Sequence, residues 1–388
     1  MLRPDNTHDL AEIIGTAVQE NRTLEIRGGG GKTDFGAPRA CDDVIDMRGF
    51  SGVSQYDPAE LVLTAGAGTQ LSEIESLVAG ENQMLAFEPW DYGLLWNRGG
   101  VATIGGTIAA GIAGSRRVSM GSARDHLLGF EAVSGRGERF IAGGNVVKNV
   151  TGFDLSKLVT GSWGRLVALT QVTLKVVPRP RLVASFALDG LSPAAAQRAM
   201  NVAMGSQAEI AAAAYLPGDP SQTVFRLEGI DPSIAARRQL VAEMHAELGM
   251  LRPLSEDEGA QFWERVQQFV ALGEDQPLWR IHLPPSQGAA MAEKLDPAGE
   301  AQWHLDWAGA LLWIATSLDA DTIRDAAASA GGHATLVRAD ATMRSRVPAL
   351  HPPASGVAKL ESKVREAFDP MGVFASARFG GGKSARAD

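Results

Sequence analysis

The sequence predicts an α+β protein with more than one domain, and three observations support this. The chain has 388 residues, and at roughly 100–200 residues per domain this length suggests two or three domains. Glycine is unevenly distributed, because 27 of the 44 glycines lie in residues 1–178, where tight turns and close backbone approaches are expected. Helix and strand patterns alternate in this half, whereas alanine-rich helices and short strands follow residue 180.

Periodic apolar residues predict the elements of the first half. Helical spacing predicts a helix over Asp9–Glu20, and alternation over Leu166–Val177 predicts a long antiparallel strand. The sequence Pro178-Arg179-Pro180 ends this strand and marks a domain boundary. The other elements expected here are strands at Thr23–Arg27 and Glu60–Thr64, a helix at Thr69–Val78, and a hairpin of Leu127–Val133 and Glu138–Ala142.

The second half predicts helices packed over an antiparallel sheet. A final amphipathic helix is predicted over residues 355–368, before Asp369-Pro370. We therefore expect domains at 1–180 and 181–345, followed by a C-terminal helix and tail at 346–388 that packs back on the first domain. The expected elements are helices at about 193–205, 232–249 and 318–331, and strands at Thr223–Glu228, Leu278–Leu283 and Ala310–Thr316.

Composition excludes several classes of protein. With 36 basic and 45 acidic residues, the net charge is −9, which argues against nucleic-acid binding. Cys41 is the only cysteine, so intramolecular disulfides, thiolate zinc sites and iron–sulfur clusters carried by this chain are excluded. The first residues are charged where a signal peptide would be apolar, and the apolar windows are shorter than the roughly 20 residues of a membrane helix. We expect a cytoplasmic protein without a transmembrane segment.

A run of four glycines follows the first predicted strand, in I-R-G-G-G-G-K-T-D-F-G from Ile26. Successive N–H groups in such a turn can point into one concavity and bind an anion such as pyrophosphate; the alternative is a mobile surface loop. The Walker A pattern would need glycine at Ile26, and a Rossmann fingerprint starting at Gly66 would need glycine at Leu71, so both fail.

A second glycine cluster extends from Ala102 to Gly121, and a third includes T-G-F-D-L and G-S-W-G before the long strand. Polar groups at Thr103, Ser115 and Ser122 could bond a diphosphate. We interpret the first two clusters as loops that clamp one long dinucleotide; tight backbone packing against a sheet is the alternative.

These glycine motifs and their order along the chain resemble those of the vanillyl-alcohol-oxidase/PCMH-type FAD-binding family. The resemblance covers about residues 1–180. The resemblance implies two α/β subdomains with FAD extended between them, the diphosphate between the first two loops and the adenine near Val167. The cofactor residues expected on this basis are Arg27, Gly28, Gly29, Gly30, Gly31, Lys32, Thr103, Ile104, Gly105, Gly106, Ala109, Gly111, Ser115, Ser122, Asp125 and Val167.

Further details, including K-N-V-T-G-F-D-L and Gly331-Gly332-His333, are similar to the E subunits of bacterial glycolate oxidases. This resemblance extends over most of the chain. It implies oxidation of glycolate to glyoxylate by a hetero-oligomer with a second FAD-binding subunit and an iron–sulfur subunit. Membrane association would then come only through those partners.

Three departures from the family pattern carry chemical meaning. The first loop has Lys32-Thr33 where covalent flavoproteins place histidine, and the second lacks cysteine, so we expect non-covalent FAD. Only Gly332-His333 remains of the family's metal-binding segment, so we expect no metal site. Of the closing F-N-P-G-R motif, only Phe374 and Arg378 persist.

Oxidation of a 2-hydroxy acid needs a cation for the carboxylate and a base for the hydroxyl proton. Arg280 and Arg378 are the candidate cations, and His282, His304 and His333 are the candidate bases, although a lone histidine on an apolar strand is more often a core residue. We propose Arg280, His282 and Arg378 as catalytic candidates. Two alternatives stay open: a free-standing FAD-dependent D-2-hydroxy-acid or alditol dehydrogenase, and a scaffold subunit without flavin.

Overall fold

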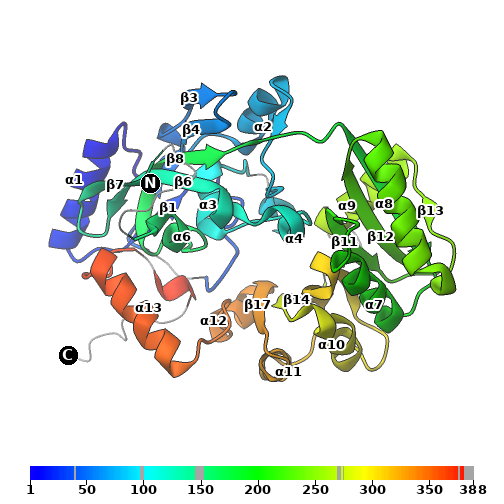
Figure 1. Ribbon diagram of the computed structural model, residues 1–388. Coiled ribbons are helices and arrows are strands. Elements are labelled where there is room, and N and C mark those ends of the chain that lie inside the picture. Colours follow the sequence, from blue (N-terminus) through cyan, green and yellow to red (C-terminus); the bar gives the residue numbers. More distant parts are fainter. Residues whose placement is uncertain are drawn as a thin grey trace. The chain divides into compact units, whose positions relative to one another are not determined.

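The computed structural model describes residues 1–38, 41–96, 100–144, 153–268, 272–273, 275–374 and 376–379. The chain divides into two compact units (Figure 1). Unit 1 comprises Met1–Ala113, Gly121–Arg179 and Pro352–Asp388, and unit 2 comprises Gly114–Met120 and Pro180–His351. The class is α+β, as the sequence predicts.

Unit 1 contains a small parallel sheet of β1 (Leu24–Arg27) and β2 (Asp43–Asp46). Helix α1 (Thr7–Gln19) packs its buried face, Leu10, Ile14 and Ala17, into the same hydrophobic cluster as Leu24 and Ile45. Asn6 caps α1 by accepting hydrogen bonds from two backbone N–H groups of its first turn.

A five-stranded antiparallel sheet in the order β3-β4-β8-β6-β7 forms the rest of unit 1. The central β8 matches the predicted long strand but ends at Lys175, because the Val176 N–H bonds to Leu61 O and the chain then pairs with β5. The predicted hairpin is β6 and β7, and the predicted last helix is α13. The elements are β3 (Val53–Asp57), β4 (Val62–Gly66), α2 (Leu71–Gly80), β5 (Gln83–Met84), α3 (Ile104–Ala110), α5 (Ala123–His126), β6 (Leu127–Ser134), β7 (Arg139–Gly143), α6 (Leu155–Val159), β8 (Val167–Lys175), β9 (Val177–Pro178) and α13 (Ser355–Phe368).

Unit 2 is an eight-stranded antiparallel sheet in the order β13-β10-β12-β11-β15-β16-β14-β17. Alternation sends Phe186 and Leu188 of β10 into one hydrophobic cluster and Ala187 into another, which includes Phe262 and Trp263 of α9. The elements are α4 (Arg117–Met120), β10 (Leu182–Asp189), α7 (Pro193–Met204), β11 (Ala212–Leu216), β12 (Gln222–Gly229), α8 (Asp231–Met244), β13 (Arg252–Pro253), α9 (Glu256–Gln268), β14 (Leu278–His282), α10 (Gly288–Leu295), β15 (Gln302–Asp306), β16 (Leu311–Ala315), α11 (Ala320–Ser329), β17 (His333–Arg338) and α12 (Ala341–Arg346).

Among the described residues, none of the helices has the length and apolar character needed to span a membrane.

Candidate functional site

The first glycine loop follows β1 and has no room for side chains. A Cβ on Gly28 would lie 2.3 Å from Thr103 Oγ1, and one on Gly29 would lie 1.6 Å from Val101 O. Gly30 has φ +81°, a left-handed conformation that favours glycine. Glycine is therefore required here because the loop lies directly against the segment that leads into α3.

The N–H groups of this loop are available to a ligand. Within the described part of the chain, those of Gly28 to Lys32 have no hydrogen-bond acceptor. By contrast, N–H groups at the start of α3 already have acceptors within the protein. Gly106 N donates to Thr103 Oγ1 at 3.3 Å, and Gly105 N donates to Ala67 O at 2.8 Å. A row of free N–H groups is the donor set that an anion such as a diphosphate needs.

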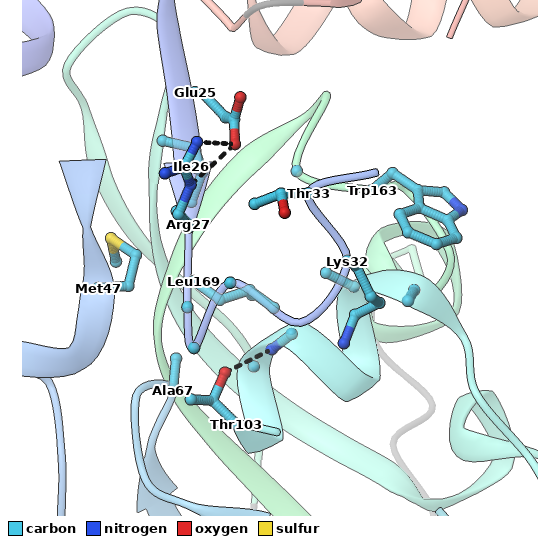
Figure 2. A pocket seen from close by; sticks show the side chains of 18 of the residues that line it. Glu25, Ile26, Arg27, Lys32, Thr33, Met47, Ala67, Thr103, Trp163 and Leu169 are labelled. Atoms are coloured by element: carbon cyan, nitrogen blue, oxygen red, sulfur yellow. Dashed lines mark hydrogen bonds and ion pairs between the residues drawn. The ribbon is translucent and has the colours of Figure 1, made fainter. Parts of the chain in front are cut away.

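Lys32 supplies a cation to the same place. Figure 2 shows its side chain extending from the loop toward α3, and a Cβ on Gly106 would lie 3.7 Å from Lys32 Nζ. Burial lowers the pKa of Lys32 to about 8, although the nearby Asp91 raises it. An ammonium group removed from water beside free N–H groups is stabilised by a bound anion, so the residues present fit the diphosphate of FAD.

These groups line one cavity of unit 1, with about 1030 Å³ of space that is partly open to solvent (Figure 2). Most of its walls come from four distant stretches of chain: β1 with its loop, the start of α3, the beginning of β8 and the residues around Phe379; Met47 and Ala67 also line it. Stacking of Phe35 on Trp163, with ring centroids 4.1 Å apart, supports one end, and both rings contact Phe379.

Arg378 holds the first loop in place. Its guanidinium donates to Phe35 O at 2.6 Å, to Lys32 O at 2.7 Å and to Thr33 O. It also lies 3.4 Å from Glu25 Oε1, which forms an ion pair with Arg27 at 2.9 Å. Arg378, predicted as a substrate cation, therefore bonds to backbone carbonyls of the cofactor loop.

The structure brings most of the predicted cofactor residues together but not all of them. Ile104 is fully buried, and Gly111 has φ +65° at the C-terminal cap of α3. Ser115 donates to Asp306 at 2.8 Å in unit 2, while the N–H and hydroxyl of Ser122 both donate to Asp125 at the start of α5. None of these five lines the cavity. The predicted cofactor residues that line the cavity are Arg27, Gly28, Gly29, Gly30, Gly31, Lys32, Thr103, Gly105, Gly106, Ala109 and Val167. The first five residues of the K-N-V-T-G-F-D-L segment, 148–152, lie outside the described residues.

The other catalytic candidates lie in unit 2, where a cationic cluster forms around Trp307. The Arg117 guanidinium lies 4.2 Å and that of Arg280 5.2 Å from the Trp307 ring centroid. His282 packs edge-on against Trp307 at 5.1 Å and stacks on His333 at 4.6 Å. Sequence reasoning missed Arg117 and Trp307, because they are far from β14 in the chain and no local spacing links them.

Among the described residues, the charged neighbours that lower the pKa values of His282 and His333 include Arg280 and Arg117, while the Asp306 carboxylate accepts a hydrogen bond from Trp307 N at 2.7 Å. Burial, and then Arg280, lowers the pKa of His282 well below its usual value and also lowers that of His333. His282 Nε2 is buried without a hydrogen-bond partner among the described residues. His304 is fully buried in β15, where burial lowers its pKa to about 3. Neutral imidazoles beside two guanidinium groups suit a small carboxylate. No group of three or more potential metal ligands occurs in the described ranges.

Comparison with known proteins identifies the family. A family model described as an FAD binding domain matches residues 1–143. The glycolate oxidase subunit GlcE of Escherichia coli is 34% identical over 377 residues, covering 96% of this chain and 97% of that protein. This chain belongs to the GlcE family. It is therefore an FAD-binding member of an oxidoreductase family.

Other relatives of the GlcE-family chain match about half of it. A D-lactate dehydrogenase of Archaeoglobus fulgidus is 28% identical over 47% of this chain and 39% of that protein. Glycolate oxidase subunit GlcD of Bacillus subtilis is 28% identical over 46% of this chain and 37% of that protein. Relatives named as different subunits indicate a multi-subunit complex. Among solved structures, an alkyldihydroxyacetonephosphate synthase shares the fold, with a TM-score of 0.67 and 15% identity over 96% of this chain and 76% of that one.

Proposed function

We propose that this chain is the FAD-binding subunit of a glycolate oxidase complex, and that it oxidises glycolate to glyoxylate only together with its partners. The observation that carries the proposal is the near full-length similarity to a subunit of that name. The single cysteine supports a separate iron–sulfur subunit, because one thiol cannot hold a cluster. A second FAD-binding subunit of the GlcD type would complete the complex.

In this proposal the chain's own residues bind and orient the cofactor. Bound FAD supplies the ability to accept two electrons from an alcohol carbon and pass them on. The N–H groups of Gly28 to Lys32 and the Lys32 ammonium hold the diphosphate, and Arg378 fixes the loop that presents them. No histidine or cysteine lines the cavity among the described residues, which supports non-covalent binding.

A second candidate function is favoured by the cluster around Trp307. Arg280 and Arg117 place guanidinium groups at Trp307 that suit a carboxylate, and Nε2 of the neutral His282 can accept a hydrogen bond from the substrate hydroxyl. This arrangement supports a chain that oxidises a 2-hydroxy acid itself, as a free-standing dehydrogenase.

Reconstitution separates these functions. The purified chain should show a flavin spectrum and release FAD on denaturation in acid, which a covalent flavin would not do. Glycolate-dependent dye reduction should then appear only after the GlcD-type and iron–sulfur subunits are added. Full activity of the chain alone would support the second candidate, and absence of flavin after incubation with FAD would contradict both.

A further inference from the structure

A groove on unit 1 lies between α13 and α6 with the segment that follows α6; among the described residues, it shares only Arg165 with the cofactor cavity. It has about 690 Å³ of space that is partly open to solvent, and Figure 1 shows α13 beside α6. Its apolar lining comes from Leu158, Leu166, Val357, Leu360 and Val364.

The apolar stripe of α13 is covered over only half its length. Val357, Leu360, Val364 and Phe368 recur at helical spacing and so lie on one face. Val364 and Phe368 pack against the hydrophobic core, but Val357 is 57% and Leu360 63% exposed. Nothing in the described chain covers the first two turns, so the stripe extends from the core into an open groove. Exposed apolar surface that continues a core is typical of a protein interface.

The charges in the groove define what can fill it. Arg165 forms an ion pair with Glu361 at 3.4 Å. Burial lowers the pKa of Arg165, Glu361 raises it, and Arg365 lowers it again. Arg365 Nε is buried without a hydrogen-bond partner among the described residues. Two guanidinium groups with one carboxylate leave a positive charge in an apolar setting, although the whole chain is acidic. An occupant with apolar side chains and one carboxylate would complement both features.

We propose that an apolar, carboxylate-bearing segment of the GlcD-type subunit docks in the groove between α6 and α13. Residues 380–388, G-G-G-K-S-A-R-A-D, contain no large apolar side chain and so cannot fill it. A second copy of this chain is the other possible occupant. The proposal rests on the proposed function, since it needs the partner subunit.

Binding of the purified GlcD-type subunit to the full-length, FAD-loaded chain tests the proposal. Val357→Asp places a charge in the groove, and Val202→Asp is a matched control, because Val202 is a 53% exposed valine on a helix of unit 2. We expect Val357→Asp to weaken binding by about tenfold or more and Val202→Asp to leave it unchanged. Arg365→Glu should also weaken it, while all three variants keep their FAD content and melting temperature.

The outcomes separate this proposal from the proposed function. If the unaltered chain does not bind the GlcD-type subunit, the proposed complex itself is contradicted. If it binds and Val357→Asp binds equally well, only the groove is contradicted. If the chain alone forms dimers that Val357→Asp dissociates, a second copy occupies the groove and the proposal is overturned.

Discussion

FAD affinity should depend on pH through Lys32. Because its pKa is about 8 before the cofactor binds, the ammonium is about nine-tenths protonated at pH 7 and about one-tenth protonated at pH 9. A bound diphosphate raises that pKa, so binding favours the protonated form. The affinity should therefore be constant up to about pH 7 and fall by about tenfold, or about 1.4 kcal/mol, between pH 7 and pH 9.

Titration of the apo-protein with FAD, followed by flavin fluorescence, measures this profile. Calorimetry at pH 8 in buffers of different ionisation enthalpy should show uptake of about half a proton per FAD bound. Lys32→Met should bind more weakly at pH 7 and lose the pH dependence, whereas Lys32→Arg keeps its charge and should have a flat profile with retained affinity. Identical profiles for the unaltered chain and Lys32→Met would refute the assignment of Lys32 to the diphosphate.

Three further predictions concern the cofactor loop and the cationic cluster. Gly29→Ala should abolish FAD binding, because its Cβ would lie 1.6 Å from a backbone oxygen, whereas Gly80→Ala meets nothing within 4 Å and should bind FAD normally; equal flavin content in both would contradict a close-packed loop. Arg378→Met should weaken FAD binding by at least about tenfold, since the loss of even one hydrogen bond from a charged group costs about 1.5–3 kcal/mol, and Arg378→Lys should restore only part of it; unchanged dissociation constants would argue against the loop contact. If unit 2 binds substrate, Arg280→Met should raise the KM for glycolate about tenfold or more with unchanged FAD content, and the exposed Arg198→Met should not; equal KM values would exclude Arg280 from carboxylate binding.

Much of the fold could be predicted because its signals are local. The last helix was predicted at 355–368 and is α13 (Ser355–Phe368), since its apolar spacing and the following Asp-Pro mark both ends. The strand predicted over Leu278–Leu283 is β14. Strands β11 and β15 were missed, because each is only five residues long and the alanine-rich sequence of β11 favours a helix.

The site was predictable only where the backbone itself binds. Runs of glycine are visible in the sequence, and Gly28 to Gly31 line the cavity. Polar side chains are less informative, because their partners are set by tertiary contacts. Ser115 was expected at the diphosphate, but its hydroxyl bonds to Asp306, 191 positions away. Arg378 was expected at the substrate, but carbonyls more than 340 residues earlier in the chain accept its hydrogen bonds.

The cofactor cavity is assembled from both ends of the chain, with Leu24 to Thr33 on one side and Phe374, Arg378 and Phe379 on another. During synthesis, the glycine loop emerges early, and all of unit 2 must leave the ribosome before the residues that clasp the loop are made. The nascent chain thus exposes an unfinished flavin pocket through most of translation. We therefore expect FAD to bind with full affinity only after Phe374, Arg378 and Phe379 have been made.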